Sequence, residues 1–199
     1  MIEIDIKGKS YGSDAVLGPI KMKILPKTTL ALLGPSGVGK STFLRIICGL
    51  DHAFSGSIIN NAKTSMVFQE PTLLPWRTAL QNITLISGAN EETAIAVLEE
   101  LGLASKQDQF PNQLSVGQQR RLSLARAFAA NPQFLIMDEP FTSLDKSLVD
   151  EMLKLTKKLI KTREVTTLFV THSQREAEYL SDEIFELSGN PATLVKQKP

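Results

Sequence analysis

The amino-acid sequence predicts an α/β fold with a mainly parallel sheet. Continuous apolar runs of strand length recur along the chain, and such runs are typical of strands that are covered on both faces. Segments with helical periodicity separate these runs, and an alternation of strands and helices favours a parallel sheet. With 199 residues, of which 42% are hydrophobic, the chain is long enough for one sizeable core, and we expect residues 1–199 to form a single domain.

The first elements alternate apolar and polar side chains. Residues 2–6 and residues 20–24 both place isoleucine or methionine at every second position. A period of two predicts half-buried strands, and we expect these two to be antiparallel strands of an N-terminal β subdomain.

The remaining elements form the expected core and an insertion. Buried strands are predicted at residues 29–33, 64–68, 133–137 and 166–170, and helices at residues 40–49, 91–101, 118–130 and 147–161. Asn90 is a good residue to start the second of these helices, and Gly102 is a good residue to end it. Because no strand pattern falls within residues 71–129, we expect a helical subdomain inserted between core segments 1–70 and 130–199.

Composition and charge exclude several classes of protein. The formal net charge of +1 is too small for the basic footprint of a nucleic-acid binder. No apolar run approaches the roughly 20 residues that span a bilayer, so a membrane role would need a partner. The first residues, MIEIDIKGKS, lack the apolar segment of a secretory signal. Cys48 is the only cysteine, which excludes an internal disulfide, and we expect it to be a small apolar side chain within a helix.

The segment GPSGVGKST, residues 34–42, is the first candidate for a binding site. It satisfies the pattern G-x-x-x-x-G-K-S/T and lies between a predicted buried strand and a predicted helix. Glycines let backbone N–H groups turn inward around phosphate oxygens, and the helix N-terminus adds a partial positive charge. Lys40 would then reach the terminal phosphates, and Ser41 would bind Mg²⁺. The competing interpretation is a glycine-rich turn with an incidental lysine.

Two adjacent carboxylates follow the buried strand in FLIMDEP, residues 134–140. Ligands of open α/β sheets bind at the carboxyl ends of the strands, where Asp138 emerges. Asp138 suits the water-mediated side of a Mg²⁺ site, and Glu139 is placed to orient or deprotonate an attacking water. The alternative is a solvated strand end, against which Pro140 and the phosphate loop both argue.

Gln69 and His172 follow two other predicted core strands. The amide oxygen of Gln69 can bind Mg²⁺, or hydrogen-bond a water, without repelling phosphate. An N–H of His172 can contact the terminal phosphate from its strand end. Taken singly, Gln69 is a routine surface glutamine, and His172 is a structural histidine of the kind that His52 is expected to be. The strand before His172 belongs to the same predicted sheet, which favours a functional role.

A second loop, LSVGQ at residues 114–118, runs into a helix that carries arginines. The Ser115 hydroxyl and the Gly117 N–H at this helix start form a candidate anion site. Two anion-binding loops in one chain raise the question of whether they hold the same phosphate.

In chain order these motifs resemble the nucleotide-binding subunit of an ATP-binding cassette (ABC) transporter, over nearly the whole chain. Residues 34–42 match the Walker A loop, Gln69 the Q-loop, LSVGQ the signature, FLIMDE the Walker B strand, SLD at residues 143–145 the D-loop, His172 the switch histidine, and Tyr11 the aromatic residue that stacks on adenine. The resemblance implies a P-loop NTPase core of RecA-like architecture.

The resemblance also implies a site shared between two copies of the chain. In this family two cassettes pack head to tail as an isologous dimer, and each ATP lies between the Walker A loop of one and the signature of the other. The two loops would therefore hold phosphates of different ATP molecules. The implied ATP-binding residues are Tyr11, Gly34, Pro35, Ser36, Gly37, Val38, Gly39, Lys40, Ser41, Thr42, Ser115, Gly117 and Gln118. The implied Mg²⁺ ligands are Ser41, Gln69 and Asp138, and the implied catalytic residues are Glu139, His172 and Gln69.

Val116 departs from the family's usual Leu-Ser-Gly-Gly-Gln signature, since it replaces the first glycine. A β-branched residue disfavours a positive φ. We therefore expect a negative φ at Val116, with the side chain turned away from the nucleotide.

Residues 69–83 resemble the region that docks the membrane subunit in this family. Leu73, Leu74 and Trp76 would form an apolar anchor for a transmembrane permease, or would instead pack inside the helical subdomain. The stretch LLPWRT is similar to the branch of importers for nitrate, sulfonate, taurine and thiamine precursors. The resemblance thus implies a cytoplasmic ATPase, held at the inner face of the cell membrane by its permease, that powers import of a small solute.

Two other functions compete with this one. A soluble ABC-type ATPase would act on ribosomes, DNA or a protein complex, but such relatives usually carry a second cassette, coiled coils or basic insertions, and the sequence contains none of these. A non-hydrolysing module would work through ATP binding alone. The intact pair of Asp138 and Glu139, together with His172, argues against that module.

Overall fold

A computed structural model describes residues 1–197, in which ten strands form one curled sheet. Strands β9 (Glu183–Gly189), β4 (Thr29–Leu33), β8 (Thr166–Val170), β7 (Phe134–Asp138) and β6 (Thr64–Val67) run parallel, in that spatial order. Four of them are the apolar runs that the sequence predicts, so the α/β fold class is confirmed. β9 was not predicted, because most of its side chains are only half-buried and form no apolar run.

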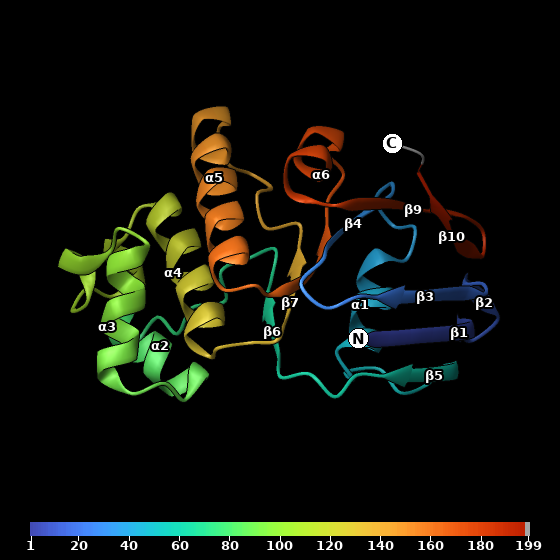
Figure 1. Cartoon of the computed structure of the whole chain (residues 1–199), viewed down its shortest axis with the longest axis horizontal. Coiled ribbons are helices and arrows are strands. Elements are labelled where there is room, and N and C mark those ends of the chain that lie inside the picture. The colour runs from blue at the N-terminus through green and yellow to red at the C-terminus, as the bar shows by residue number, and fades with distance from the viewer. Residues whose placement is uncertain (198–199) are drawn as a thin grey trace.

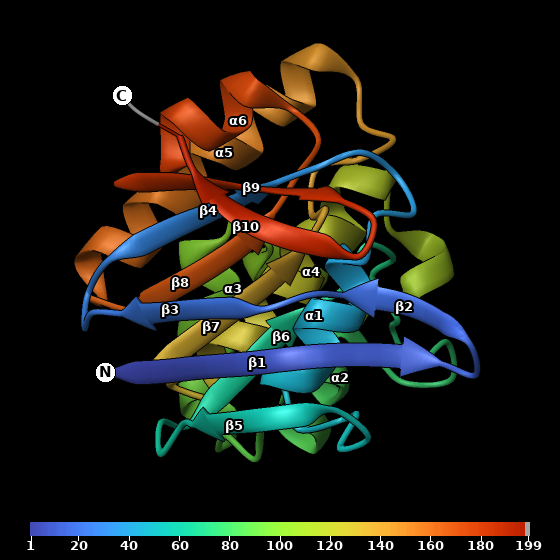
Figure 2. The ribbon, with the colours of Figure 1, turned by 90° about the vertical axis from the view of Figure 1, so that its right-hand side faces the viewer.

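A mostly antiparallel group of strands continues the sheet beyond β9 (Figures 1 and 2). It comprises β10 (Ala192–Lys196), β2 (Asp14–Leu17), β1 (Ile2–Tyr11), β3 (Ile20–Ile24) and β5 (Ser55–Ile59). The antiparallel pairing of β1 with β3 confirms the prediction from the two alternating segments. β2, β5 and β10 escaped prediction because they are short and largely exposed or half-buried.

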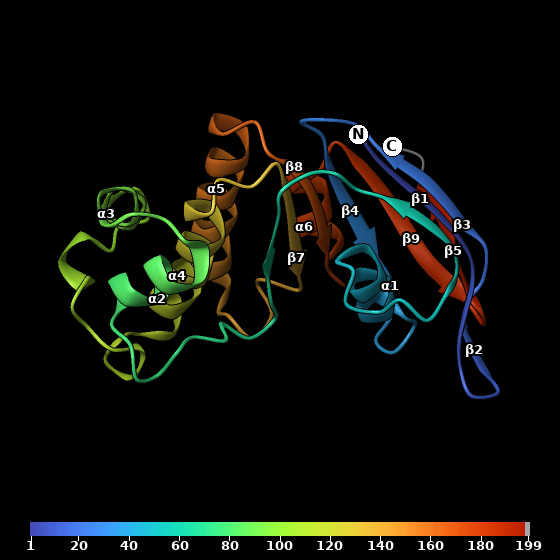
Figure 3. The same ribbon diagram turned by 90° about the horizontal axis from the view of Figure 1, so that it is seen from below.

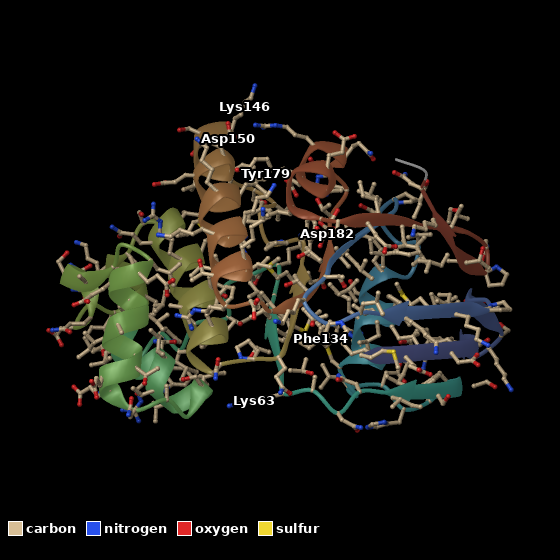
Figure 4. All side chains as sticks on the ribbon, in the orientation of Figure 1. Lys63, Phe134, Lys146, Asp150, Tyr179 and Asp182 are labelled. Atoms are coloured by element: carbon tan, nitrogen blue, oxygen red, sulfur yellow. The ribbon has the colours of Figure 1, made fainter. Side chains whose placement is uncertain are left out.

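Helices cover both faces of the parallel strands (Figure 3). α1 (Lys40–Ile47) lies between these strands and the antiparallel group. α5 (Lys146–Thr162) and α6 (Gln174–Leu180) pack on the other face. These two helices contact each other, since the Lys157 ammonium lies 4.3 Å from the centroid of the Tyr179 ring. Tyr179 is labelled in Figure 4.

Buried side chains alternate between the two faces of the central strands. In β4, Leu30 and Leu32 belong to the apolar cluster around α1, whereas Ala31 and Leu33 belong to the cluster around α5. Phe134, at the start of β7, is fully buried in the α1 cluster (Figure 4). Burial on both faces explains why the strands read as continuous apolar runs.

Residues 71–129 hold α2 (Ala79–Ser87), α3 (Glu91–Glu100) and α4 (Val116–Ala129), with 3₁₀ turns at residues 104–106 and 111–113. Their buried side chains share one apolar cluster with α5 and one face of the sheet. Because this packing is continuous, the division into a helical subdomain at about residues 71–129 and a core at 1–70 and 130–199 stays a prediction. The last two residues of that core segment lie outside the described residues. None of the helices within residues 1–197 is long and apolar enough to cross a bilayer.

Helix ends follow local capping. The Asn90 side chain accepts a hydrogen bond from the Thr93 N–H at 2.9 Å, and Gly102 has a φ of 70° just after α3, as expected from the sequence. α2 was not predicted, although a capping box of Thr78 and Gln81 starts it. α4 begins at Val116 and not at residue 118, because its cap lies further upstream.

Candidate active site

The motifs that the sequence singled out meet at the carboxyl edge of the parallel strands. β4, β6, β7 and β8 are parallel neighbours or near neighbours, so their carboxyl ends lie along one edge. Backbone hydrogen bonds hold their continuations together: the Glu139 N–H donates to the Val170 carbonyl at 3.0 Å, and the Thr171 N–H donates to the Leu32 carbonyl at 3.2 Å. Segments far apart in sequence are thereby fixed within one site.

A pocket of about 330 Å³ lies at this edge. It is lined by Ser36, Gly37, Gly39, Lys40, Ser41 and Thr42 of the phosphate loop, together with Gln69 and Glu139. The pocket therefore joins the phosphate loop to a candidate metal ligand from β6 and a candidate base from β7, as the sequence predicts.

The backbone of the phosphate loop requires glycine. Gly39, which precedes α1, has a φ of 112°, a conformation that L side chains rarely adopt. A Cβ atom there would lie 2.9 Å from Leu17 and 3.1 Å from Val16 of β2. The loop is thus pressed against the β1–β2 hairpin, and α1 begins directly behind the pocket.

Lys40 is buried, with 5% of its surface exposed, and its ammonium is held at the pocket. Its Nζ donates to the carbonyls of Gly34 at 2.8 Å and Pro35 at 2.9 Å, and lies 3.4 Å from Glu139 Oε1. Because a positive charge and a helix N-terminus face the same space, the pocket favours a phosphate group.

Asp138 and Ser41 supply oxygen donors beside the pocket. The Ser41 hydroxyl lies 3.5 Å from Asp138 Oδ2. Burial raises the pKa of Asp138 above its ordinary value, and neighbouring Glu139 raises it further, whereas the hydrogen bond from Ser41 and the charges of Lys40 and Arg45 lower it. A half-buried carboxylate next to a hydroxyl, with the amide of Gln69 lining the same pocket as Ser41, is a set of hard oxygen ligands, which fits Mg²⁺.

Glu139 adopts a strained backbone conformation, with a φ of 43°. The Glu139 carboxylate contacts two side chains of the site. Oε1 lies 3.4 Å from the Lys40 ammonium, and Oε2 accepts a hydrogen bond from the Thr142 hydroxyl at 3.3 Å. Nδ1 of His172 lies 3.5 Å from the same Oε2, and the His172 side chain is 58% exposed. Glu139 and His172 are therefore adjacent, as the predicted catalytic roles require.

Two buried arginines of α4 were missed by sequence reasoning. The Arg120 guanidinium donates to the Gln69 carbonyl and, at 3.2 Å, to the Thr142 carbonyl. Arg126 donates to the carbonyls of Pro71 at 3.0 Å and Thr72 at 2.8 Å. α4 is thereby tied to the backbone that follows β6 and to the loop after Glu139. Their only signal in the sequence is a pair of arginines on a helix whose other buried residues are apolar or small.

The signature segment stands apart from the pocket lining. Ser115 caps α4: its Oγ accepts from the Gln118 N–H at 3.3 Å, while Gln118 Oε1 accepts from the Ser115 N–H at 2.9 Å. Gly117 is buried, and a Cβ atom there would lie 2.9 Å from Leu148. Val116 is the first residue of the helix, has a negative φ as predicted, and is 60% exposed. In the described chain the structure does not bring Ser115, Gly117 or Gln118 into the pocket with Lys40.

Tyr11 also lies outside the pocket lining, at the end of β1. The residue is 47% exposed. The hairpin turns after Tyr11 and continues into β2, which contacts Gly39 of the phosphate loop. Tyr11 is therefore on the strand pair that borders the pocket.

The three residues of the expected apolar anchor differ in their exposure to solvent. Leu73 is partly buried and packs against the helical cluster, and Leu74 is partly buried, whereas Trp76 is 66% exposed. Sequence reasoning missed a nearby groove lined by Phe68, Thr72 and Ile86 with parts of β6 and α4. Phe68 is 38% and Ile86 54% exposed, so apolar surface extends from the end of β6 to α2.

Comparison with known proteins agrees with this geometry. Residues 17–142 match the family model described as ABC transporter. The chain is 36% identical to the aliphatic sulfonates import ATP-binding protein SsuB 1 of Pseudomonas savastanoi pv. phaseolicola, over 100% of this chain and 85% of that protein. It is 41% identical to the aliphatic sulfonates import ATP-binding protein SsuB of Mycobacterium sp. (strain MCS), over 94% of this chain and 79% of that protein.

A solved structure has the same fold. It is the dimeric structure of a post-hydrolysis state of the ATP-binding cassette MJ0796 bound to ADP and Pi, with a TM-score of 0.85, 28% identity, and coverage of 100% of this chain and 98% of that chain. Since the family model spans most of the chain and relatives align along nearly all of it, the chain belongs to the ABC transporter family.

Proposed function

We propose that the chain is the ATP-binding and ATP-hydrolysing subunit of an ABC importer for a small solute. The single observation that carries this proposal is the pocket that joins Lys40 and Ser41 of the phosphate loop to Gln69 and Glu139. The sulfonate-import names of the relatives support the importer branch. The alternative, a soluble ABC-type ATPase acting on a non-membrane complex, has no such support.

ATP binds with its phosphates in the loop of residues 34–42 and its adenine on Tyr11. Lys40 exchanges its contacts to the Gly34 and Pro35 carbonyls for the terminal phosphate oxygens. Ser41, Gln69 and, through water, Asp138 are the residues that would hold Mg²⁺. When bound, this ion would neutralise charge on the phosphates.

Glu139 orients the attacking water and accepts its proton. The strained turn and the Thr142 hydroxyl fix the carboxylate, and His172 next to it contacts the terminal phosphate. Catalysis of phosphoryl transfer depends mainly on positioning and electrostatic stabilisation, and these contacts supply both.

A second copy of the chain completes each site in a head-to-tail dimer. Ser115 and the Gly117 N–H of that copy would close over the terminal phosphate, since both lie at the N-terminus of α4. Gln118, the third expected ATP contact of this segment, already holds the loop through its side-chain oxygen, which is engaged in the capping box. The dimer named for the similar cassette supports this arrangement.

A transmembrane permease is the proposed membrane partner, which would hold the chain at the inner face of the cell membrane. Trp76 is the most exposed of the three expected anchor residues, and Phe68 and Ile86 of the groove supply further exposed apolar surface. Large exposed apolar side chains of this kind dominate protein interfaces. Leu73 contributes indirectly, because it packs against the helical cluster.

The experiment that tests this function is copurification from the native host. The tagged chain is extracted with membranes in mild detergent, alongside a Trp76→Ser variant and an Ile59→Ser control on β5, whose exposed isoleucine lies away from the groove. We expect a polytopic membrane protein in equal amount with the wild-type chain and the control, and less of it with Trp76→Ser. Recovery only with ribosomes, DNA or another soluble assembly would overturn the transport function and keep the ATPase.

A further inference from the structure

We propose that Asp51 is a positioning residue for the nucleotide base, because its carboxylate fixes the ring of Tyr11 (the inference rests on the proposed stacking of adenine on Tyr11). Nothing in the motif pattern assigns a role to Asp51, which follows α1 after a short turn. Asp51 lies in a cluster of contacts with the end of β1 and the end of α1.

The Asp51 carboxylate is held on several sides. Lys9 Nζ lies 2.9 Å from Oδ1 and 2.7 Å from Oδ2, and the Ala53 N–H donates to Oδ1 at 2.9 Å. Lys9 Nζ also donates to the Ala53 carbonyl at 2.8 Å. The Asp51 N–H donates to the Arg45 carbonyl at 3.2 Å, which ties the carboxylate to the last turn of α1.

These contacts keep Asp51 ionised and fixed. The hydrogen bonds from Lys9 and then from Ala53 hold the pKa of Asp51 below its ordinary value. The side chain of Lys9 is only 2% exposed and that of Asp51 15% exposed. A shielded ion pair with backbone partners keeps one geometry, unlike an exposed pair.

Tyr11 is the group that this pair orients. The Tyr11 hydroxyl donates to Asp51 Oδ2 at 3.0 Å. On one face of the ring, the Lys9 ammonium lies 4.3 Å from the centroid. With 47% of the residue exposed, the ring keeps a free face on which a base can stack. Lys9 and Asp51 thus fix both the plane of the ring and the face that it offers.

The helix α1 and the β1–β2 hairpin both connect this cluster to the phosphate loop. The start of α1 contributes Lys40 and Ser41 to the phosphate pocket, and the turn after α1 carries Asp51. The β1–β2 hairpin, which carries Tyr11 at the end of β1, touches Gly39 of the phosphate loop through Val16 and Leu17 of β2. Because the ring is already ordered in the free chain, less conformational entropy is lost when a base stacks on it, and binding of the base is stronger.

The test compares ATP with inorganic tripolyphosphate, which has phosphates and no base. Dissociation constants of both are measured by calorimetry on the full chain and on Tyr11→Ala, Asp51→Asn and the double variant. We expect Tyr11→Ala to weaken ATP binding about tenfold, and Asp51→Asn to weaken it about threefold. Neither variant should change the binding of tripolyphosphate, and Asp51→Asn should have no further effect when Tyr11 is already alanine.

Asp51→Asn leaves the buried Lys9 without its counter-charge, which destabilises the fold. A second variant that keeps this ion pair is therefore needed. Tyr11→Phe removes only the hydrogen bond to Asp51 and should weaken ATP, but not tripolyphosphate, about threefold. The matched control is Glu3→Gln, on the same strand as Tyr11, which breaks the exposed pair with Lys23 of β3 and should change neither constant.

The outcomes separate this inference from the function on which it rests. If Tyr11→Ala leaves ATP affinity unchanged, adenine does not stack there, and both ideas fail. If Tyr11→Ala weakens ATP but Tyr11→Phe and Asp51→Asn do not, the stacking stands and the positioning role is wrong. An Asp51→Asn effect that is equal for ATP and tripolyphosphate, or that persists in the Tyr11→Ala background, would also overturn the positioning role.

Discussion

The Lys40 ammonium lies 3.4 Å from the carboxylate of Glu139. The two residues come from the loop after β4 and the end of β7, and the strand β8 separates those strands in the sheet. Each is the other's nearest counter-charge in the pocket. A phosphate group would take the place of Glu139 beside Lys40, leaving the carboxylate available to a water molecule.

Replacing Lys40 by alanine should weaken binding of Mg·ATP by about tenfold to a hundredfold, because charge-assisted hydrogen bonds to phosphate are lost. Calorimetric titration of Lys40→Ala measures this directly. Lys27→Ala is the matched control, since Lys27 pairs with Glu164 on an exposed surface away from the pocket. Unchanged affinity in Lys40→Ala would disprove the phosphate-loop assignment.

Replacing Ser115 by alanine should destabilise the protein by about 1 kcal/mol, because α4 loses its N-terminal cap. In thermal unfolding this corresponds to a fall in Tm of about 2–4 °C for a chain of this size. Ser115→Thr keeps the hydroxyl and should unfold close to the wild-type temperature. Equal Tm values for Ser115→Ala and the wild type would show that the cap contributes nothing.

Arg120→Leu should reduce ATP turnover more than ATP affinity. Without its guanidinium, the carbonyls of Gln69 and Thr142 lose their shared donor, and both belong to segments that carry proposed catalytic groups. We expect kcat to fall by at least about tenfold, since small displacements of reacting groups are costly. Arg121→Leu, which breaks contacts to Leu101 and Glu151 instead, should retain more activity. Equal loss in both variants would mean a general effect on stability.

Cys48 should react slowly with alkylating reagents in the folded protein. Burial, and then the charge of Asp138, raise the pKa of its thiol from 9.0 to about 11. At pH 8 the folded chain therefore holds about a hundredfold less thiolate than the unfolded chain, and thiolate is the reactive form. Iodoacetamide labelling with and without urea, followed by mass spectrometry, measures the ratio. Equal rates would contradict a shielded thiol.

The raised pKa of Cys48 also predicts how the stability of the fold depends on pH. The unfolded chain loses the Cys48 proton first as the pH rises, so folding is favoured less between pH 9.0 and about 11 than below pH 9.0. A Cys48→Ala variant should show a smaller fall in Tm across this window.

Local patterns explain what the sequence predicted. The phosphate loop, the Asp138–Glu139 pair, Gln69 and His172 all follow apolar strands, and parallel neighbours necessarily bring their carboxyl ends together. The negative φ of Val116 followed from its branched Cβ alone.

Contacts between distant segments explain what the sequence missed. Arg120 and Arg126 donate hydrogen bonds to backbone carbonyls, and contacts to the backbone leave no pattern of residue types in the sequence. Asp51 meets Tyr11 only because β1 and the turn after α1 are adjacent in space. The helix α2 was missed because exposed Leu85 and Ile86 blur its amphipathic pattern.

ATP turnover by Glu139→Gln is the most direct test of the central claim, that Glu139 activates water in the pocket of Lys40 and Ser41. Binding of ATP should be retained, because the amide keeps the shape of the side chain. Hydrolysis should fall by about a hundredfold or more, as for the loss of a general base. Hydrolysis at the wild-type rate would contradict the assignment of Glu139, and with it the account of the site.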